Sequence, residues 1–289
     1  MSYWNSSPFL TQLVRSAPGI LQKIYRPYLT NRLRCNDRVD TLIGHYTFII
    51  RQGMGPMVLR AAQVPVLLGE LAGKSGGAYQ IRLAAATTLE TEGELALQIS
   101  KDCAVLYSVA FTFTAAPGMR TLTIGCLQGP RGPDALDRVR NATRDLFGLR
   151  PKNLLLRLVT QIAHKTGCEE VVLVSNGNRV LVHQARKGLV FADYDTTWKE
   201  IGAVRGRDCD FRLSCKTVAL PDMDTVESRK RSEARKRFAL IDHAGELIWA
   251  ALQRKPFSLA PEIDKPAETS SEAVSNTRQG IVRSGLPNK

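Results

Sequence analysis

Residues 120–152 constrain the fold of this chain more than any other part of it. An apolar strand pattern at residues 121–127 runs into a Gly/Pro loop at residues 128–133, and the loop leads into two arginine-bearing helices. A strand that ends in glycines directly before a helix leaves backbone N–H groups and the positive end of the helix dipole facing outward. We therefore expect an anion-binding site at this junction.

Four runs before this stretch are rich in β-branched or aromatic residues, and turn clusters separate them. They cover residues 64–71, 78–87, 94–100 and 105–114. Their spacing predicts an antiparallel meander that strand 121–127 joins. Further strands are expected at 171–175, 180–183 and 211–219, the first two around the turn Asn176-Gly177-Asn178. The predicted class is α+β, with a mostly antiparallel central sheet flanked by helices.

Glycine, proline and capping residues mark the helix boundaries. The apolar face expected on the first helix after the loop consists of Leu136, Val139, Thr143 and Leu146. Gly148 fits the left-handed position that closes this helix. Pro151 suits the first position of the next helix, which we expect to end at Gly167. A capping box of Asp224 and Glu227 predicts the start of the last helix.

Length and composition predict a substantial core. The chain has 289 residues, 44% of them hydrophobic. We expect an N-terminal helical segment at 1–56, an α+β domain at 57–253, and a disordered tail at 254–289, where aromatic residues are nearly absent. No apolar segment has the length of a signal peptide core or the ~20 residues that span a bilayer. We therefore expect a cytoplasmic protein without a transmembrane segment.

The charge of the chain is strongly basic. A net charge of +13 favours anionic partners such as nucleic acid, lipid head groups, phosphorylated metabolites or a coenzyme. The densest basic cluster is residues 229–237, with the sequence RKRSEARKR. Such a run either binds an anionic partner or forms a solvated helix face that pairs with Glu227 and Glu233. The chain lacks a recognition helix, a zinc finger and an RNA-binding signature, which argues against nucleic acid.

Neither a metal site nor a redox pair is indicated. The six cysteines form no C-x-x-C pair, and the four histidines show no paired spacing. In a reducing compartment we expect the cysteines to be small buried apolar residues.

The candidate anion-binding residues lie in and around the Gly/Pro loop. They are Gln128, Gly129, Arg131, Gly132, Arg150 and Lys152. Guanidinium and ammonium groups beside such a loop can pair with phosphate. Pro130 and Pro133 contribute no N–H, however, so the loop has fewer donors than a true phosphate-binding turn. A tight structural connection between strand and helix is the alternative interpretation.

Two further groups of residues have both a functional and a structural interpretation. Glu92 and Glu94 have the alternate spacing that places side chains on one strand face, and with His45 they would form an acid/base set. The alternatives are a solvated Glu-Gly-Glu turn and a packed histidine. Tyr194 and Trp198 would either wall a pocket for an acyl chain or a ring, or fasten a loop to the core.

Several motifs in this chain resemble one family when they are taken in order. They are Tyr25-Arg-Pro-Tyr28, His45-Tyr46, Glu92-Gly-Glu-Leu95, residues 124–156, Val174-Ser-Asn176, Tyr194-Asp195 with Trp198, Glu200 and Gly202, and the helix from Lys230-Arg231 to Asp242. Together they resemble the VirK/YbjX family of Gram-negative bacteria, which has no established reaction. The residues at Asn178-Arg179 and after Gly202 depart from that pattern. The resemblance implies roles in virulence, outer-membrane and surface integrity, envelope stress and antimicrobial peptide resistance, and it supplies no catalytic residue.

The expected strand order also resembles a known enzyme fold. An antiparallel meander followed by strand, loop, helix and strand is similar to the GNAT acyltransferase fold. That resemblance implies binding of the acyl-CoA pyrophosphate at the loop after the central strand. The GNAT loop pattern itself is not met, because Arg131 stands at its first glycine and Pro133 at its last position.

Two functional hypotheses follow. The first is a cytoplasmic protein that binds or transfers an acyl group from a phosphate-bearing donor, with acyl-CoA or acyl carrier protein as the candidate cofactor. The second is a non-enzymatic basic adaptor that docks through residues 229–237 on anionic lipid or an acidic protein, at the periphery of the inner membrane.

Overall fold

The central sheet begins with five consecutive strands that pair antiparallel. In the computed structural model, which describes residues 2–85, 89, 91–116, 118–182, 192–215 and 227–254, these are β1 (Val66–Ala72), β2 (Ala78–Ala85), β3 (Leu95–Lys101), β4 (Ala104–Ala116) and β5 (Met119–Gln128). Each lies within a few residues of a strand expected from the sequence. The predicted antiparallel meander is therefore confirmed.

The sheet continues beyond β5 with one parallel pair. β6 (Glu170–Leu173) lies parallel to β5, and β8 (Phe211–Ser214) and β7 (Val204–Arg205) add antiparallel pairs. The described strands thus form one eight-stranded sheet in the order β1-β2-β3-β4-β5-β6-β8-β7. Helices α4 (Ala135–Asp145) and α5 (Pro151–Lys165) connect β5 to β6, because parallel neighbours need a long crossover. The predicted α+β class and the GNAT-like strand order are confirmed.

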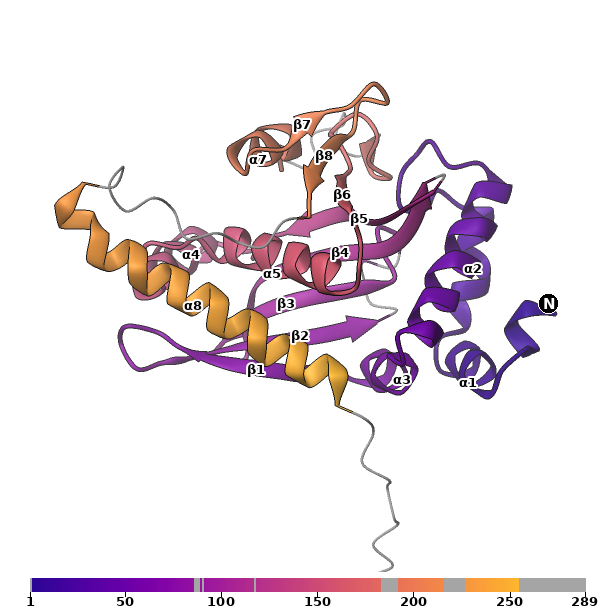
Figure 1. The fold of residues 1–289 in the computed structure, drawn as a ribbon, viewed down its shortest axis with the longest axis horizontal. Helices are drawn as coiled ribbons and strands as arrows, with labels where there is room; N and C mark the ends of the chain where they lie inside the picture. The colour runs from indigo at the N-terminus through magenta and orange to yellow at the C-terminus, as the bar shows by residue number, and fades with distance from the viewer. Residues whose placement is uncertain are drawn as a thin grey trace, which may run out of the picture. The chain divides into compact units, whose positions relative to one another are not determined.

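The other described helices cover the sheet and one end of its strands. They are η1 (Tyr3–Asn5), α1 (Pro8–Ser16), η2 (Pro18–Tyr25), α2 (Cys35–Arg51), α3 (Gly55–Gln63), α7 (Tyr194–Glu200) and α8 (Ser228–Gln253). Figure 1 shows α1, α2 and α3 grouped at one end of the strands, whereas α5 and α8 run across the sheet. α8 packs on β1 and α5, and α5 packs on β3 and β4. None of the described helices has the length and apolar character needed to cross a membrane.

The predicted boundaries of α4 and α5 agree with the structure. Gly148 and Gly167 have φ angles of 77° and 78°, and Pro151 is the first residue of α5. The predicted apolar face of α4 is wrong at Leu136, whose side chain is 71% exposed. The reason is that α4 buries only Ala142 within the helix, so it packs against the protein near its C-terminal end.

Alternation along the strands places polar residues beside the predicted loop. Paired positions on β2 to β5 form one buried apolar row of Leu83, Leu97, Val109 and Leu127. Adjacent positions point to the opposite face of the sheet. They form a polar row of Arg82, Gln98, Ser108 and Gln128. The polar row therefore ends at Gln128, where the Gly/Pro loop begins.

A bulge in β5 shapes the sheet at this end. Ala110 pairs with Cys126 and Phe111 pairs with Ile124, which leaves Gly125 without a partner. A Cβ atom at Gly125 would lie 2.0 Å from the carbonyl oxygen of Glu92, so only glycine fits there. The pairing of β5 with β6 also ends at Ile124. β5 therefore continues to Gln128 without β6 beside it.

Residues 180–182 do not form the strand that their β-branched sequence predicted. The N–H of Val182 donates to the carbonyl of Arg179 at 3.1 Å, which makes a turn. The side-chain amide of Asn178 donates to the carboxylate of Asp210 at 2.9 Å. This bond ties the turn to the loop before β8, and β8 becomes the antiparallel partner of β6.

Residues Met1–Pro256 form one unit. Leu10 and Leu13 of α1 lie in the same hydrophobic core as the strands. The division of the chain at residues 56 and 57 stays a prediction. The predicted tail after Arg254, Asp224 of the expected capping box, His183 and residues 216–219 lie outside the described residues.

Candidate functional site

Three of the predicted anion-binding residues, Gly129, Arg150 and Lys152, lie near one another where β5 loses its parallel neighbour. We call this region the β5 corner and define it by Gln128, Gly129, Arg150, Lys152, Tyr194 and Glu200. A Cβ atom at Gly129 would lie 3.0 Å from the ring of Tyr107, so the loop packs closely on that ring. Burial raises the pKa of Tyr107, and the positive charge of Arg150 partly offsets the effect. Loop, ring and Arg150 are thus neighbours.

The two cations at the start of α5 share one carboxylate. Arg150 is the N-cap residue of α5, and its guanidinium lies 3.5 Å from Oε2 of Glu200 on α7. The ammonium of Lys152 lies 3.2 Å from the same oxygen and 3.3 Å from the hydroxyl of Thr197. One carboxylate therefore faces two cations, which leaves a positive charge uncompensated. Arg150 and Glu200 are 57% and 42% exposed, so solutes reach the pair.

Tyr194 and Trp198 are buried, and their polar atoms contact the backbone. The hydroxyl of Tyr194 accepts from the N–H of Leu127 at 3.1 Å, and the indole N–H of Trp198 donates to the carbonyl of Val174 at 2.9 Å. Tyr194 thus satisfies a backbone group that β6 no longer reaches. Both rings fasten α7 to the ends of β5 and β6, and neither lines an open pocket.

Buried polar groups lie directly behind the corner. The thiol of Cys126 lies 3.4 Å from the hydroxyl of Tyr194, and the side chain of Glu92 forms a hydrogen bond with Cys126. Burial raises the pKa of Glu92, while the bond to Cys126 and the charge of Arg179 oppose the rise. Burial also raises the pKa of the Cys126 thiol and of the Tyr194 phenol. Thiol and phenol therefore keep their protons beside a carboxyl group with an elevated pKa.

Arg179 adds a buried cation to this set. Its side chain is 5% exposed, and its guanidinium lies 4.8 Å from the ring centre of Tyr194. One amino group donates to the carbonyl of Ala192 at 2.9 Å. The Nε and Nη1 groups have no hydrogen-bond partner among the described residues. The Nε and Nη1 donors of Arg179 are therefore available near Glu92.

The outer part of the loop is exposed. Arg131 and Gly132 face solvent, and Gly132 has a φ of 98° that favours glycine. The guanidinium of Arg138 donates to the carbonyl of Arg131 at 2.8 Å. Arg138 therefore fixes the loop, while the side chain of Arg131 stays exposed.

The expected acid/base set is divided between two places. Glu92 belongs to the set behind the β5 corner, whereas Glu94 and His45 lie in a separate buried network with Lys23 and Tyr46. Glu92 and Glu94 are 5% and 1% exposed, so the solvated-turn interpretation is wrong. A Cβ at Gly93 would lie 2.6 Å from the backbone nitrogen of Phe111, which shows how closely this segment packs on β4.

The buried network is centred on Glu94. Its Oε1 lies 2.7 Å from the ammonium of Lys23, and Tyr46 donates its hydroxyl hydrogen to Oε2. Burial alone would raise the pKa of Glu94, but the charge of Lys23, the charge that His45 carries when protonated, and the hydrogen bonds from Lys23 and Tyr46 lower it. The backbone N–H of Phe113 donates to Nδ1 of His45 at 3.1 Å. All four side chains are buried, which favours a structural role for the network.

His45 stays neutral in this environment. Burial lowers its pKa to about 4. The negative charge of Glu94 partly offsets this effect, and the positive charge of Lys23 adds a smaller lowering. Its Nε2 has no hydrogen-bond partner among the described residues. The packed-histidine interpretation fits this position better than a base that contacts substrate.

Three residues of this region, Cys126, Arg179 and Glu200, were not predicted from the sequence to belong to a site. Cys126 was expected to be a small apolar residue, although Gly125 beside it signals a bulge or a close backbone approach.

The cysteines are all free, and Cys35, Cys103 and Cys209 are exposed, so the burial expected for them is wrong. Within the described ranges, no three His, Cys, Asp or Glu side chains group as metal ligands.

A protein-family model described as "Protein of unknown function (DUF535)" matches residues 1–249. The chain belongs to the DUF535 family. One relative of this DUF535 chain is the "Uncharacterized protein YbjX" of Escherichia coli (strain K12), which is 27% identical over 248 residues, or 84% of this chain and 74% of the relative. The predicted VirK/YbjX family is therefore confirmed.

Two Haemophilus influenzae proteins, each described as "Uncharacterized protein", are also similar to the DUF535 chain. One is 31% identical over 138 residues, which cover 47% of this chain and 45% of the relative. The other is 22% identical over 247 residues, which cover 84% of this chain and 80% of the relative.

Solved structures of a cAMP-binding acyltransferase from Mycobacterium smegmatis show a loose likeness to the DUF535 chain. A mutant of that enzyme has a TM-score of 0.33 at 11% identity, covering 75% of this chain and 62% of that chain. The unmutated enzyme has a TM-score of 0.31 at 10% identity, covering 76% and 66%. The DUF535 chain thus spans less than two thirds of those chains. These TM-scores are too low to bear on its activity.

Proposed function

We propose that this protein binds an acylated, phosphate-bearing ligand, acyl-CoA or acyl carrier protein, at the β5 corner. Through this ligand it would act in envelope maintenance, including the virulence, outer-membrane integrity and antimicrobial peptide resistance implied by its VirK/YbjX resemblance. The supporting observation is that Arg150 and Lys152 share the single carboxylate of Glu200 at the start of α5.

A phosphate group would compete with Glu200 for these two cations. Charge-assisted hydrogen bonds from guanidinium and ammonium groups to phosphate are stronger than neutral ones. The N-terminal end of α5 adds the positive end of its dipole. Gly129 lies beside the ring of Tyr107, and the charge of Arg150 acts on that ring, so the loop would bound the ligand.

Transfer of the acyl group would depend on the polar groups behind the corner. Glu92, with its raised pKa, would take a proton from an attacking amine or hydroxyl. The proton taken up by Glu92 would then pass to the leaving thiolate. The buried Cys126 thiol and Tyr194 phenol keep their own protons and would hold Glu92 in position. His45 and Glu94 have no part in this proposal, because both are fully buried elsewhere.

Thermal unfolding with added ligand tests the binding step. Decanoyl-CoA, free CoA and decanoyl-acyl carrier protein would be added to the wild type, to Arg150→Ala and to Arg140→Ala. Arg140 is an exposed control cation that pairs with Asp137 on α4. A ligand that binds the native form raises the Tm, so the acylated ligands should stabilise the wild type and the control but not Arg150→Ala. Equal shifts in all three proteins would contradict the proposal.

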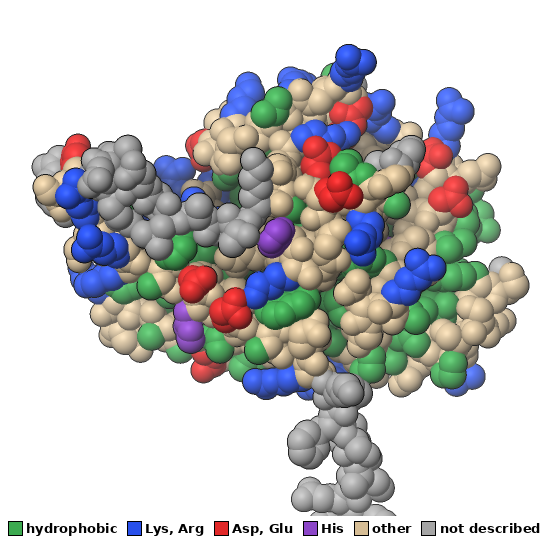
Figure 2. Space-filling model, viewed as in Figure 1, with side chains coloured by type: hydrophobic (Ala, Val, Ile, Leu, Met, Phe, Trp, Pro, Cys, Tyr) green, Lys and Arg blue, Asp and Glu red, His purple; other side chains and the backbone are tan. Residues whose placement is uncertain are grey.

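A basic adaptor is the second candidate function, and one observation favours it. The first described turns of α8 are largely exposed, and the buried residues of the helix begin at Leu240. Figure 2 shows Lys and Arg side chains gathered over this end of α8. Reversing Lys230, Arg235 and Lys236 to Glu should abolish binding to anionic vesicles, and wild-type binding should fall steeply with salt. Vesicle binding that persists in the triple variant would exclude this function.

A further inference from the structure

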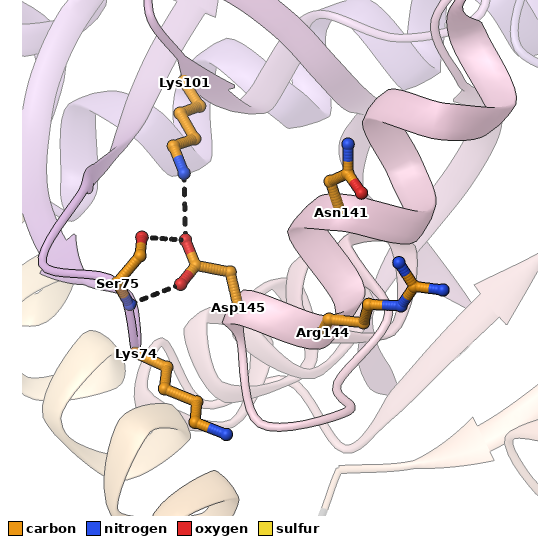
Figure 3. A pocket seen from close by; sticks show the side chains of 6 residues that line it. All are labelled: Lys74, Ser75, Lys101, Asn141, Arg144 and Asp145. Carbon is orange, nitrogen blue, oxygen red and sulfur yellow. Dashed lines mark hydrogen bonds and ion pairs between the residues drawn. The ribbon is translucent and has the colours of Figure 1, made fainter.

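A shallow cationic cleft lies at the end of α4 that is remote from the Gly/Pro loop. We call it the hairpin cleft; it has a volume of about 540 Å³ and is lined by Lys74, Ser75, Lys101, Asn141, Arg144 and Asp145. Figure 3 shows Lys101 and Ser75 converging on Asp145, with Asn141 and Arg144 on α4 beside them. The loop precedes the first residue of α4, and Asp145 is the last residue of that helix. None of the residues that line the cleft belongs to the β5 corner.

The carboxylate of Asp145 is fully engaged within the protein. It accepts from the N–H of Ser75 at 2.7 Å, the hydroxyl of Tyr79 at 2.8 Å and the ammonium of Lys101 at 2.9 Å. Burial opposes ionisation, but the hydrogen bonds from Lys101, Ser75 and Tyr79 hold the pKa of Asp145 well below its usual range. Three lining cations therefore face one ionised carboxylate, which leaves two positive charges uncompensated.

Two of the cations have donors available for a ligand. Neither the ammonium of Lys74 nor the guanidinium of Arg144 pairs with a carboxylate among the described residues. Lys101 donates to Asp145 and lies 3.4 Å from the hydroxyl of Tyr79, so one of its hydrogens is also free. The amide of Asn141 is exposed on the same side of α4.

The cleft is held in shape by the backbone of the β1–β2 hairpin. The N–H of Lys74 donates to the carbonyl of Asp145 at 2.8 Å, and the N–H of Gly73 donates to the carbonyl of Gly77 at 2.8 Å. A Cβ atom at Gly73 would lie 2.4 Å from the carboxylate of Asp145, so hairpin and helix end are in close contact. The backbone positions that carry Lys74 and Arg144 are thus fixed relative to each other before any ligand binds.

We propose that the hairpin cleft binds a phosphate monoester. A monoester carries nearly two negative charges at neutral pH and presents three acceptor oxygens, which match the two uncompensated charges and the free donors of Lys74, Arg144 and Lys101. A phosphodiester carries a single charge and has fewer free oxygens. The ligand is either a soluble phosphate monoester or the head group of a lipid that ends in one. The proposal does not depend on acyl binding at the β5 corner.

The test compares ligands and variants on the full chain. Calorimetric titrations would use glycerol 3-phosphate and, as the diester control, glycerophosphoglycerol. Flotation would use vesicles containing phosphatidic acid or phosphatidylglycerol. The variants are Lys74→Gln/Arg144→Gln, the charge-conserving Lys74→Arg/Arg144→Lys, and Arg140→Gln as a matched control on α4. Unchanged Tm values without ligand would show that the variants fold; if the double Gln variant unfolds, Arg144→Gln alone replaces it.

The expected result is binding of the monoester by the wild type, by the control and by the charge-conserving variant. The double Gln variant should bind about tenfold or more weakly, because charged hydrogen bonds are lost. Binding of glycerol 3-phosphate identifies a soluble ligand, and binding of phosphatidic acid vesicles alone identifies a lipid; both support the proposal. No binding to any monoester, equal affinity for monoester and diester, or an unchanged Kd in the double Gln variant would overturn it.

Discussion

Lys23 and Glu94 lie 71 residues apart in the sequence and form an ion pair of 2.7 Å in which both side chains are fully buried. The pair joins η2 to the segment that leads into β3. Tyr46 on α2 donates a hydrogen bond to the same carboxylate, and the ring of His45 packs against the ring of Tyr46. The N-terminal helices are therefore bound to the sheet by a polar network as well as by apolar contacts.

Replacing Lys23 with Met should destabilise the protein strongly. The substitution leaves the carboxylate of Glu94 buried without its cation, which typically costs about 3–5 kcal/mol. The free energy of unfolding in urea would measure the loss. Lys165→Met is the matched control, because Lys165 pairs with Glu246 at the surface and should contribute about 0–1 kcal/mol.

The double variant Lys23→Met/Glu94→Gln distinguishes the cost of an unpaired buried charge from the other effects of replacing Lys23. Removing both charges should recover part of the stability lost in the single variant, since no unpaired buried charge remains. If the single Lys23→Met variant were as stable as the surface control, the buried pair would have no such role.

Stability should fall as the pH is lowered from about 6.5 to about 4, owing to His45. Burial lowers the pKa of native His45 to about 4, whereas the unfolded histidine titrates near 6.5. The unfolded chain therefore takes up this proton first, and stability decreases with falling pH across that window. The shift corresponds to roughly 3 kcal/mol. Urea unfolding at several pH values would measure it.

His45→Asn isolates the contribution of this histidine. Asparagine keeps an acceptor for the N–H of Phe113 and cannot be protonated, so the slope between pH 6.5 and 4 should flatten. Exposed His243 provides the control, and His243→Asn should retain the wild-type slope. Glu94 affects stability in a different pH range. Its lowered pKa adds stability above its ordinary pKa of 4.5, and this stability is lost only as the pH falls below 4.5. Parallel slopes for wild type and His45→Asn would refute this assignment.

Tyr194→Phe should cost about 1–3 kcal/mol, because it leaves the buried N–H of Leu127 without an acceptor. Thermal or urea unfolding measures this loss. Tyr25→Phe is a suitable control, since Tyr25 is 80% exposed and should change stability by less than about 0.5 kcal/mol. A neutral effect of Tyr194→Phe would mean that the hydroxyl does not hold α7 to β5.

The sequence was sufficient to predict most strands of the sheet, but not which segment pairs with β6. Alternation of apolar residues marks β1 to β5 because each strand has one buried face. Residues 180–182 carry the same β-branched signal and still form a turn, because Asn178 bonds to Asp210 from a distant loop. A local pattern contains no information about such a tertiary bond.

The candidate site was predictable only in part for a similar reason. Gln128, Gly129, Arg150 and Lys152 are close in the chain, and the strand-to-helix order brings them together. Glu200 comes from α7, so its pairing with both cations required the fold. Glu94 looked like a solvated residue because Lys23, its buried partner, is remote in the sequence.

Glu200 provides the most direct test of ligand binding at the β5 corner. Decanoyl-CoA would be titrated by calorimetry into the wild type, Arg150→Ala and Glu200→Gln. If an anionic group takes the place of the Glu200 carboxylate, Glu200→Gln should bind several-fold more tightly and Arg150→Ala about tenfold more weakly than the wild type, because removing a charged hydrogen bond costs about 1.5–3 kcal/mol. An absence of binding to the wild type, or the same Kd in all three proteins, would contradict the account.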